Sequence, residues 1–222
     1  MRRLMFVGHY SAAFAAKGLA PRVPLWALLL AAQFVDVLWA GFVLAGVERV
    51  RLDPSLPSNP LDLVHMPFTH GLLATVGWTA LAWGVGRRWL GPGRRALALA
   101  GVVASHWFLD LLVHRPDLPL LYAEPRLGLA LWNRPAIALA LELALFGAGV
   151  AFCLLRGGVS QECRGRLLWL AAGLLVLQLA TLSGSAPPQV PALVSSMALL
   201  FALVALAGAW VERGRGSAAL VD

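Results

Sequence analysis

The segment SHWFLDLLVH, residues 105–114, places three side chains that can bind a proton or a metal at the end of a long apolar run. His106, Asp110 and His114 follow one another at intervals of four residues. Because positions four apart lie on one face of a helix, the three side chains form a single polar stripe. Imidazole nitrogen and carboxylate oxygen are common ligands of zinc and related divalent ions. The spacing therefore predicts a metal-binding face on a helix that is otherwise apolar.

Ionisable residues are costly inside a bilayer, so those in apolar runs are candidates for function. Five further His, Asp or Glu residues lie in or beside such runs: His9, Asp36, His65, His70 and Glu142. At a helical rise of about 1.5 Å per residue, His70, His106, Asp110, Glu142 and Asp36 lie roughly 5–15 Å from one end of their runs, within the same half of the membrane. The common depth predicts one shared site, although each residue alone also fits a hydrogen-bonded packing role.

The complete set of eight ligand-type groups exceeds the four that one zinc ion takes. We therefore expect a divalent metal, with zinc as the best match to the ligand types, and room for more than one ion. Asp36 is the deepest carboxylate, and we predict that it serves as a ligand or as the general base. Arg115 and Asp117 follow His114 in an outward loop, where they are predicted to position a substrate head group or to form a solvated pair.

The composition indicates a polytopic membrane protein. Of 222 residues 59% are hydrophobic and 13% charged, and the mean hydropathy is +0.75, which argues against a soluble domain. Six runs are long enough to span a bilayer, which takes about 20 residues; they are 23–46, 66–86, 96–113, 135–155, 167–184 and 191–211. A seventh, 4–21, is shorter, and we predict that it crosses or re-enters the membrane with His9 at its outward end.

These runs predict an all-α bundle that forms a single domain over residues 1–222. Residues 4–155 would carry the metal-site helices, and 167–211 would add two scaffold helices, of which Gln178 is the most polar deep residue. The linkers 49–62, 115–134 and 156–166 are rich in Pro, Gly and charge, which is typical of loops.

The net charge of +7 comes from seventeen Arg and one Lys. They lie in short loops between apolar runs, which is the positive-inside pattern rather than a nucleic-acid-binding patch. Eleven lie in 17–22, 87–95, 156–166 and the tail after 211, against five in 49–62 and 115–134. The first group is therefore predicted to be cytoplasmic and the second, with the site, to face outward.

The segments VHMPFTHGLL (64–73) and SHWFLDLLVHRPD (105–117) resemble the paired motifs of the YdjM-like family of membrane-bound metal-dependent hydrolases. That family has a histidine and, five residues on, a Thr-His pair that opens one helix, and Ser-His-x-x-x-Asp in a later helix. His9 and Asp36 match its N-terminal His and the Asp of its following span. Met66 departs from the pattern, because the family often has Arg there, and the resemblance covers roughly residues 4–150.

The order of ligands resembles, more distantly, that of the zinc-dependent bacterial phospholipases C. Their metal-bridging His-x-x-x-Asp pair is matched by His106 and Asp110, a following His by His114 and a late Glu by Glu142. The two resemblances imply a hydrolase of a bacterial inner membrane that acts on a phosphoester or lipid-linked substrate.

Two other functions fit the same residues. Membrane chains of Asp, Glu and His serve as relays in transporters of protons, metal ions or small solutes, although no inverted repeat is apparent here. Bis-histidine haem binding through His70 and His106 is disfavoured by the nearby carboxylates.

Overall fold

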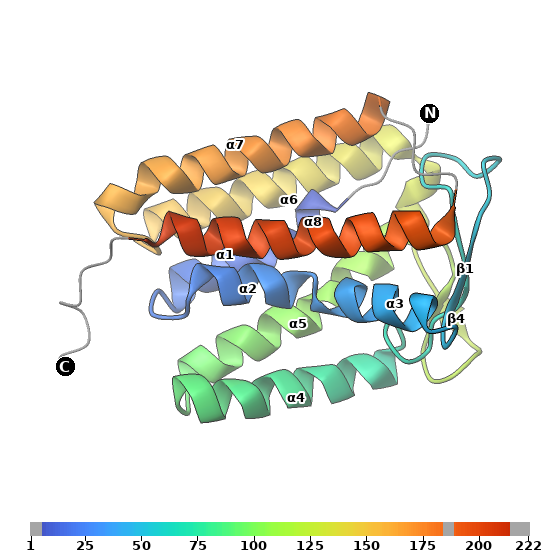
Figure 1. The fold of residues 1–222 in the computed structure, drawn as a ribbon, viewed down its shortest axis with the longest axis horizontal. Coiled ribbons are helices and arrows are strands. Elements are labelled where there is room, and N and C mark those ends of the chain that lie inside the picture. Colours follow the sequence, from blue (N-terminus) through green and yellow to red (C-terminus); the bar gives the residue numbers. More distant parts are fainter. Residues whose placement is uncertain (1–5, 184–188, 214–222) are drawn as a thin grey trace.

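The computed structural model of the chain describes residues 6–183 and 189–213, and this part is mostly helical (Figure 1). The α-helices are α1 (Tyr10–Leu19), α2 (Leu25–Ala32), α3 (Phe34–Leu44), α4 (Leu72–Leu90), α5 (Arg94–Val113), α6 (Pro135–Leu155), α7 (Gln161–Ser183) and α8 (Val190–Val211). Two short 3-10 helices, η1 (Val7–His9) and η2 (Leu131–Asn133), precede α1 and α6. The expected all-α architecture is confirmed.

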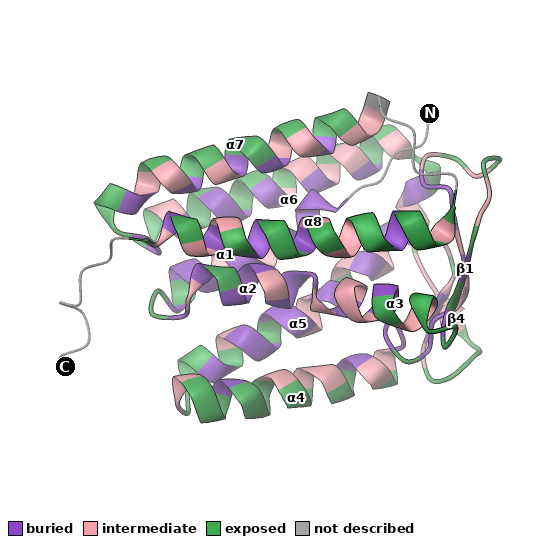
Figure 2. Ribbon diagram, in the orientation of Figure 1, coloured by how far each residue is buried: buried purple, intermediate pink, exposed green. Residues whose placement is uncertain are grey.

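Four helices are long and apolar enough to cross a membrane: α5, α6, α7 as far as Leu182, and α8. The pair α2 and α3 passes the same test as one bent span, which gives up to five. Helix α4 is not among them, because three Trp and two Arg lower its apolar character. The exposed residues lie largely on the outward sides of the helices (Figure 2), and many are large and apolar. These features indicate a membrane protein.

The connections between the helices fall at two opposite ends of the bundle (Figure 1). At the first end α1 passes to α2, α4 to α5 and α6 to α7, and α8 ends. The strands and the segment between α5 and α6 lie at the second end. The loops expected on opposite sides of the membrane thus lie at opposite ends, with 17–22, 87–95 and 156–166 together at the first.

The first long apolar run is broken at Gln33, where the α2 and α3 axes meet at 52°. No Pro or Gly lies at the break, so its cause is tertiary. The Gln33 amide donates to the carbonyl oxygen of Phe6 at 3.3 Å. Helix ends leave carbonyl groups without partners, and the carbonyl of Ala32 accepts instead from Nδ1 of His106 at 2.8 Å. The break also puts Asp36 in the first turn of α3, where the helix dipole favours a carboxylate.

Two short antiparallel pairs close the second end of the bundle. Strand β1 (Arg49–Leu52) pairs with β2 (Leu61–His65), and β3 (Leu118–Pro119) pairs with β4 (Arg126–Leu127). Strands β1, β3 and β4 lie within linkers that the composition presents as loops, and β2 begins in the linker 49–62 and continues to His65. The extended runs RVRL and LDLVH alternate in exposure along β1 and β2. The strands bring Leu61 and Leu63 against the cavity described below.

Gly149 allows α6 to pack closely against α1, which begins just after His9. A Cβ atom at position 149 would lie 2.6 Å from the carbonyl oxygen of Ser11. We therefore expect Gly149→Ala to lower the free energy of unfolding by about 1–3 kcal/mol, as overpacking typically does. Denaturant titration in micelles measures this. Gly147→Ala is the matched control, because a Cβ there meets nothing within 4 Å; equal losses in both variants would contradict the close-packing account.

Candidate metal centre

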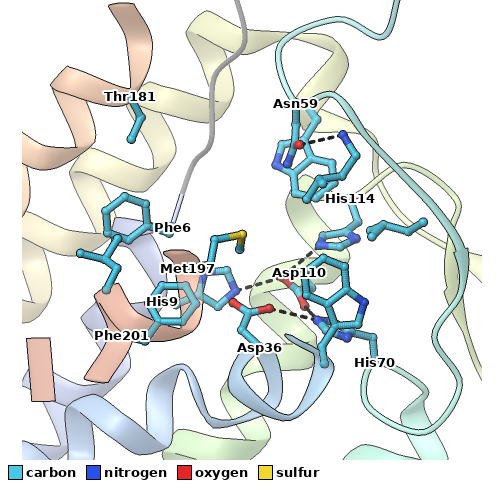
Figure 3. Close-up of a pocket in the computed structure, with 15 residues that line it drawn as sticks. Phe6, His9, Asp36, Asn59, His70, Asp110, His114, Thr181, Met197 and Phe201 are labelled. Carbon is cyan, nitrogen blue, oxygen red and sulfur yellow. Dashed lines mark hydrogen bonds and ion pairs between the residues drawn. The ribbon is translucent and has the colours of Figure 1, made fainter. Parts of the chain in front are cut away.

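Asp110 lies at the centre of a buried cluster in which each carboxylate oxygen faces two histidines. Figure 3 shows three of these histidines, His9, His70 and His114, around Asp110. Its Oδ1 is 3.0 Å from Nε2 of His9 and 3.3 Å from Nε2 of His114. Its Oδ2 is 3.2 Å from Nε2 of His106 and 3.7 Å from Nε2 of His70. The two oxygens of one carboxylate thus separate the four imidazoles into two pairs.

Asp36 brings a second carboxylate to the same place. Its Oδ1 lies 3.3 Å from Nε2 of His70 and 3.7 Å from Nε2 of His106. With 19% of its side chain exposed, Asp36 is the most accessible member. The set is called the Asp110 cluster below and comprises His9, Asp36, His70, His106, Asp110 and His114.

Four separate elements position the Asp110 cluster. Helix α5 supplies the predicted stripe, in which His106 and His114 each pair with Asp110 at a spacing of four residues. η1 supplies His9, the first turn of α3 supplies Asp36, and the turn before α4 supplies His70. The convergence predicted for His70, His106, Asp110 and Asp36 is confirmed.

The far nitrogens of two imidazoles, those of His106 and His114, are each held by an oxygen. Nδ1 of His106 bonds the Ala32 carbonyl, and Nδ1 of His114 lies 2.9 Å from a carboxylate oxygen of Asp117. Because a carbonyl and a carboxylate only accept, each Nδ1 carries the proton and the neutral ring presents its Nε2 lone pair. Those lone pairs point at carboxylates, so the arrangement requires positive charge between them, supplied by a cation or by protons on the rings.

The side chains fit a divalent metal ion by three observations. Nε2 of His106 and Oδ2 of Asp110 are buried and 3.2 Å apart, and within residues 6–183 and 189–213 neither has a hydrogen-bond partner. Two atoms that each lie about 2.0–2.1 Å from a tetrahedral ion are about 3.3–3.4 Å apart, close to the 3.0–3.7 Å between the nitrogens and oxygens here. Among the described residues, two groups have ligand atoms close enough to share an ion: His9, His106 and Asp110, and Asp36, His70 and His106.

Glu142 and Gln178 hold the helix that carries His9. Oε2 of Glu142 accepts from the backbone N–H of Gly8 at 3.2 Å. Oε1 of Gln178, on α7, accepts from the N–H groups of Phe6 and Val7 at 3.2 and 3.4 Å. The first N–H groups of a helix have no partner within the helix. Here Glu142 and Gln178 accept from those at the start of η1, which are buried away from water. The carboxylate of Glu142 therefore lies against the backbone of the residue before His9.

Three predicted site residues lie beside the cluster and make other contacts. The ring of His65, at the end of β2, packs against Phe68 and Tyr122 with centroids 6.1 and 5.4 Å away. Arg115 donates to the backbone oxygens of Pro57, Asn59 and Leu61 and to the side chain of Asn133. Asp117 bonds Nδ1 of His114. Arg115 therefore braces the linkers at the second end, and Asp117 orients a cluster histidine.

A cavity of about 80 Å³ adjoins the Asp110 cluster. One side is polar, with His9, Asp36, His70, Asp110 and His114, and the other is mainly apolar, with Phe6, Leu61, Leu63, Met197, Leu200 and Phe201. Trp39, Asn59, Trp132 and Thr181 complete the lining. The space exceeds the ~10–15 Å³ that one water molecule needs. Helix α8 thus forms part of the wall, a role that its uniformly apolar sequence did not signal.

Buried His and Asp groups that could hold a metal ion therefore lie inside a helical membrane protein, next to a cavity with one polar and one apolar side. The chain matches no family model, no curated protein and no solved structure.

Proposed function

We propose that the protein is a membrane-embedded, metal-dependent hydrolase whose catalytic centre is the Asp110 cluster. The observation that carries the proposal is the pairing of both Asp110 oxygens with imidazole nitrogens 3.0–3.7 Å away. Burying two carboxylates is costly, and a bound cation offsets that cost. The resemblance of 64–73 and 105–117 to the YdjM-like motifs supports the same reaction class, and we propose that the chain belongs with that family.

The cluster supports two ions, and zinc suits its imidazole and carboxylate ligands best. His9, His106 and Asp110 would hold one ion, with His114 beside Oδ1 of Asp110 as a further ligand. Asp36 and His70 would hold the other, with Asp110 as the shared carboxylate. Bound there, divalent ions would polarise the scissile bond and lower the pKa of a water molecule.

The remaining chemistry belongs to the chain's own residues. Asp36 is the most accessible carboxylate of the cluster and lines the cavity, so we assign it the general-base role through its second oxygen, while Oδ1 faces the ion. Asp117 and the Ala32 carbonyl keep the rings of His114 and His106 in one orientation. Met197 and Phe201 exclude water from the apolar side of the cavity.

The cavity suggests an amphiphilic substrate. Its polar side would receive the reacting group, and its apolar side would contact the adjoining hydrocarbon. We propose a phosphoester or lipid-linked substrate that reaches the site from the bilayer. The space of about 80 Å³ suits the reacting group alone, so the rest of the substrate would extend out of the cavity.

We also propose that the second end of the bundle faces away from the cytoplasm. The first end carries Arg87, Arg88, Arg94, Arg95 and Arg156, the pattern of cytoplasmic loops. Leu61 and Leu63, which line the cavity beside the cluster, belong to strand β2 at the second end. The site would then open toward the outer leaflet of a bacterial inner membrane.

The test is hydrolysis by the purified protein in mixed micelles. Bis(p-nitrophenyl) phosphate serves as a soluble phosphodiester, and phosphatidylcholine and phosphatidic acid serve as lipid substrates. We expect hydrolysis of at least one of them that 1,10-phenanthroline abolishes and added zinc restores. Removing a general base typically costs a factor of about 10²–10⁴, so Asp36→Asn should slow the reaction at least 100-fold.

Asp62→Asn is the matched control, because Asp62 is an exposed carboxylate that pairs with Arg51 on the surface strands. It should retain the wild-type rate. Zinc-loaded protein that hydrolyses none of the three substrates, or equal rates in both Asn variants, would contradict the proposal.

A transporter is the second candidate, favoured by the broken helix α2–α3. Interrupted helices at an ion site are common in transporters, and here the break puts Asp36 and the Ala32 carbonyl at the cluster. Zinc uptake into proteoliposomes would favour this function if it occurs without hydrolysis.

A further inference from the structure

Glu48 is a buried acid that lies outside the Asp110 cluster, and its carboxylate accepts three hydrogen bonds. It follows α3 and is only 1% exposed. Its Oε1 accepts from the backbone N–H groups of Phe68 and Thr69 at 2.8 and 3.0 Å. Its Oε2 accepts from the hydroxyl of Thr69 at 2.6 Å. One carboxylate therefore fixes both the backbone and the side chain of the residue that precedes His70.

Thr69 connects Glu48 to the cluster. Its Oγ1 lies 2.8 Å from Nδ1 of His70. A hydroxyl has a single proton, and here that proton is donated to the Glu48 carboxylate, which only accepts. The lone pair of Oγ1 must then accept from His70, so Nδ1 of His70 carries the proton. The other nitrogen, Nε2, is left with its lone pair facing Asp36 and Asp110, at 3.3 and 3.7 Å.

We propose that Glu48 is a positioning residue of the metal centre that acts through Thr69 to hold His70 in the tautomer that binds metal through Nε2. The inference rests on the proposed metal site and does not depend on which reaction the site performs. Outer-shell carboxylates of this kind orient ligating imidazoles and raise their basicity. Glu48 does so through a hydroxyl, and it also fixes the turn from which His70 projects.

The four cluster histidines come from three parts of the chain, and His70, His106 and His114 are held in different ways. His106 is held by a backbone carbonyl and His114 by the carboxylate of Asp117. His70 is held through Thr69 by Glu48, a buried carboxylate twenty-two residues earlier in the chain. The position of the loop after α3 is thereby coupled to the geometry of the metal centre.

The first test uses the unchanged protein and needs no variant. With ¹⁵N-labelled histidine, NMR spectra of the metal-free protein in micelles report which ring nitrogen of each of the five histidines is protonated. We expect Nδ1 of His70 to carry a proton at neutral pH. A neutral His70 that is protonated at Nε2 alone would overturn the inference, whether or not the protein binds metal.

The second test measures zinc affinity by competition with a chelator. Thr69→Val keeps the shape of the side chain and removes the hydroxyl, and we expect a loss of about 10–100-fold, the usual effect of removing such a partner. Thr69→Ser keeps the hydroxyl and should bind zinc like the wild type. Glu48→Gln, which loses the charge, should lose affinity as Thr69→Val does.

Thr75→Val is the matched control, because Thr75 is also buried and its hydroxyl donates only to the backbone oxygen of Gly71, near the start of α4. It should leave zinc affinity unchanged. Wild-type affinity in Thr69→Val, or the same loss in Thr75→Val, would overturn the positioning role. If the wild-type protein itself binds no zinc, the proposed function fails, and the NMR measurement still decides the inference.

Discussion

Asp110→Asn should remove the metal from the protein, with zinc affinity falling more than 100-fold. Asn keeps the size of the side chain and loses its charge. One of the two atoms that now face histidine pairs becomes an NH₂ group, which donates hydrogen bonds and cannot ligate an ion. Outer-shell changes alone cost about 10–100-fold in affinity, so a change at the shared ligand should cost more. Metal analysis after equilibration with zinc measures the effect.

The same substitution discriminates the metal site from a network of ion pairs among protonated histidines. In a network of that kind, Asp110→Asn would leave charged rings buried without a partner, and the protein would lose stability whether or not zinc is present. In a metal site, zinc should raise the unfolding midpoint of the wild type and leave that of Asp110→Asn unchanged. Equal stabilisation of both proteins by zinc would contradict a central role for Asp110.

Lys17→Met should be the most destabilising single substitution at the first end of the bundle. Lys17 is fully buried, and its Nζ donates to the carbonyl oxygens of Pro21 and Val23 at 2.7 Å each and to Oε1 of Glu212 at 2.5 Å. Oε2 of Glu212 accepts from the N–H of Leu25. The pair thus fastens the ends of α1 and α8 to the start of α2. Breaking a buried pair costs about 3–5 kcal/mol, because the remaining carboxylate loses the positive charge that offsets its burial.

Unfolding in mixed micelles measures this loss. The double variant Lys17→Met, Glu212→Gln should recover part of it, because the negative charge of the buried Glu212 is then removed as well. The exposed pair Arg51–Asp62 offers the contrast, and Arg51→Met should change stability little. A double variant less stable than Lys17→Met alone would mean that the charge pair is not what fastens the three helices.

The helical stripe of the site is predictable from the sequence because its geometry is local. His106, Asp110 and His114 lie on one helix, and a spacing of four residues fixes their common face whatever surrounds them. The apolar runs likewise predict the long helices α5, α6, α7 and α8, since a bilayer demands both length and apolar composition.

The break at Gln33 is not predictable, because its causes lie elsewhere in the chain. The segment LLLAAQFVDVL reads as one continuous helix, and only contacts with Phe6 and His106 make an interruption favourable. At about 1.5 Å per residue, the distances of the site residues from the ends of their apolar runs differ by about 10 Å. The bend in the α2–α3 pair accounts for part of that difference.

The contacts around the cluster also cannot be predicted from the sequence. Glu48 lies in a polar linker, where a Glu usually faces solvent, and nothing local indicates its bond to Thr69. His65 belongs to the same motif as His70, yet it ends a strand and its ring packs on Phe68 and Tyr122. Spacing along the chain does not reveal which side of the intervening turn each histidine faces.

The most direct test of the account is the position of bound metal. Crystals or two-dimensional arrays of the protein equilibrated with zinc can be measured by diffraction at wavelengths on either side of the zinc absorption edge. We expect anomalous density between Asp110 and its histidines, within about 2.0–2.2 Å of the Asp110 oxygens and Nε2 atoms. Zinc-equilibrated protein with anomalous density only at surface residues, and none between Asp110, His106 and His9, would contradict the metal centre.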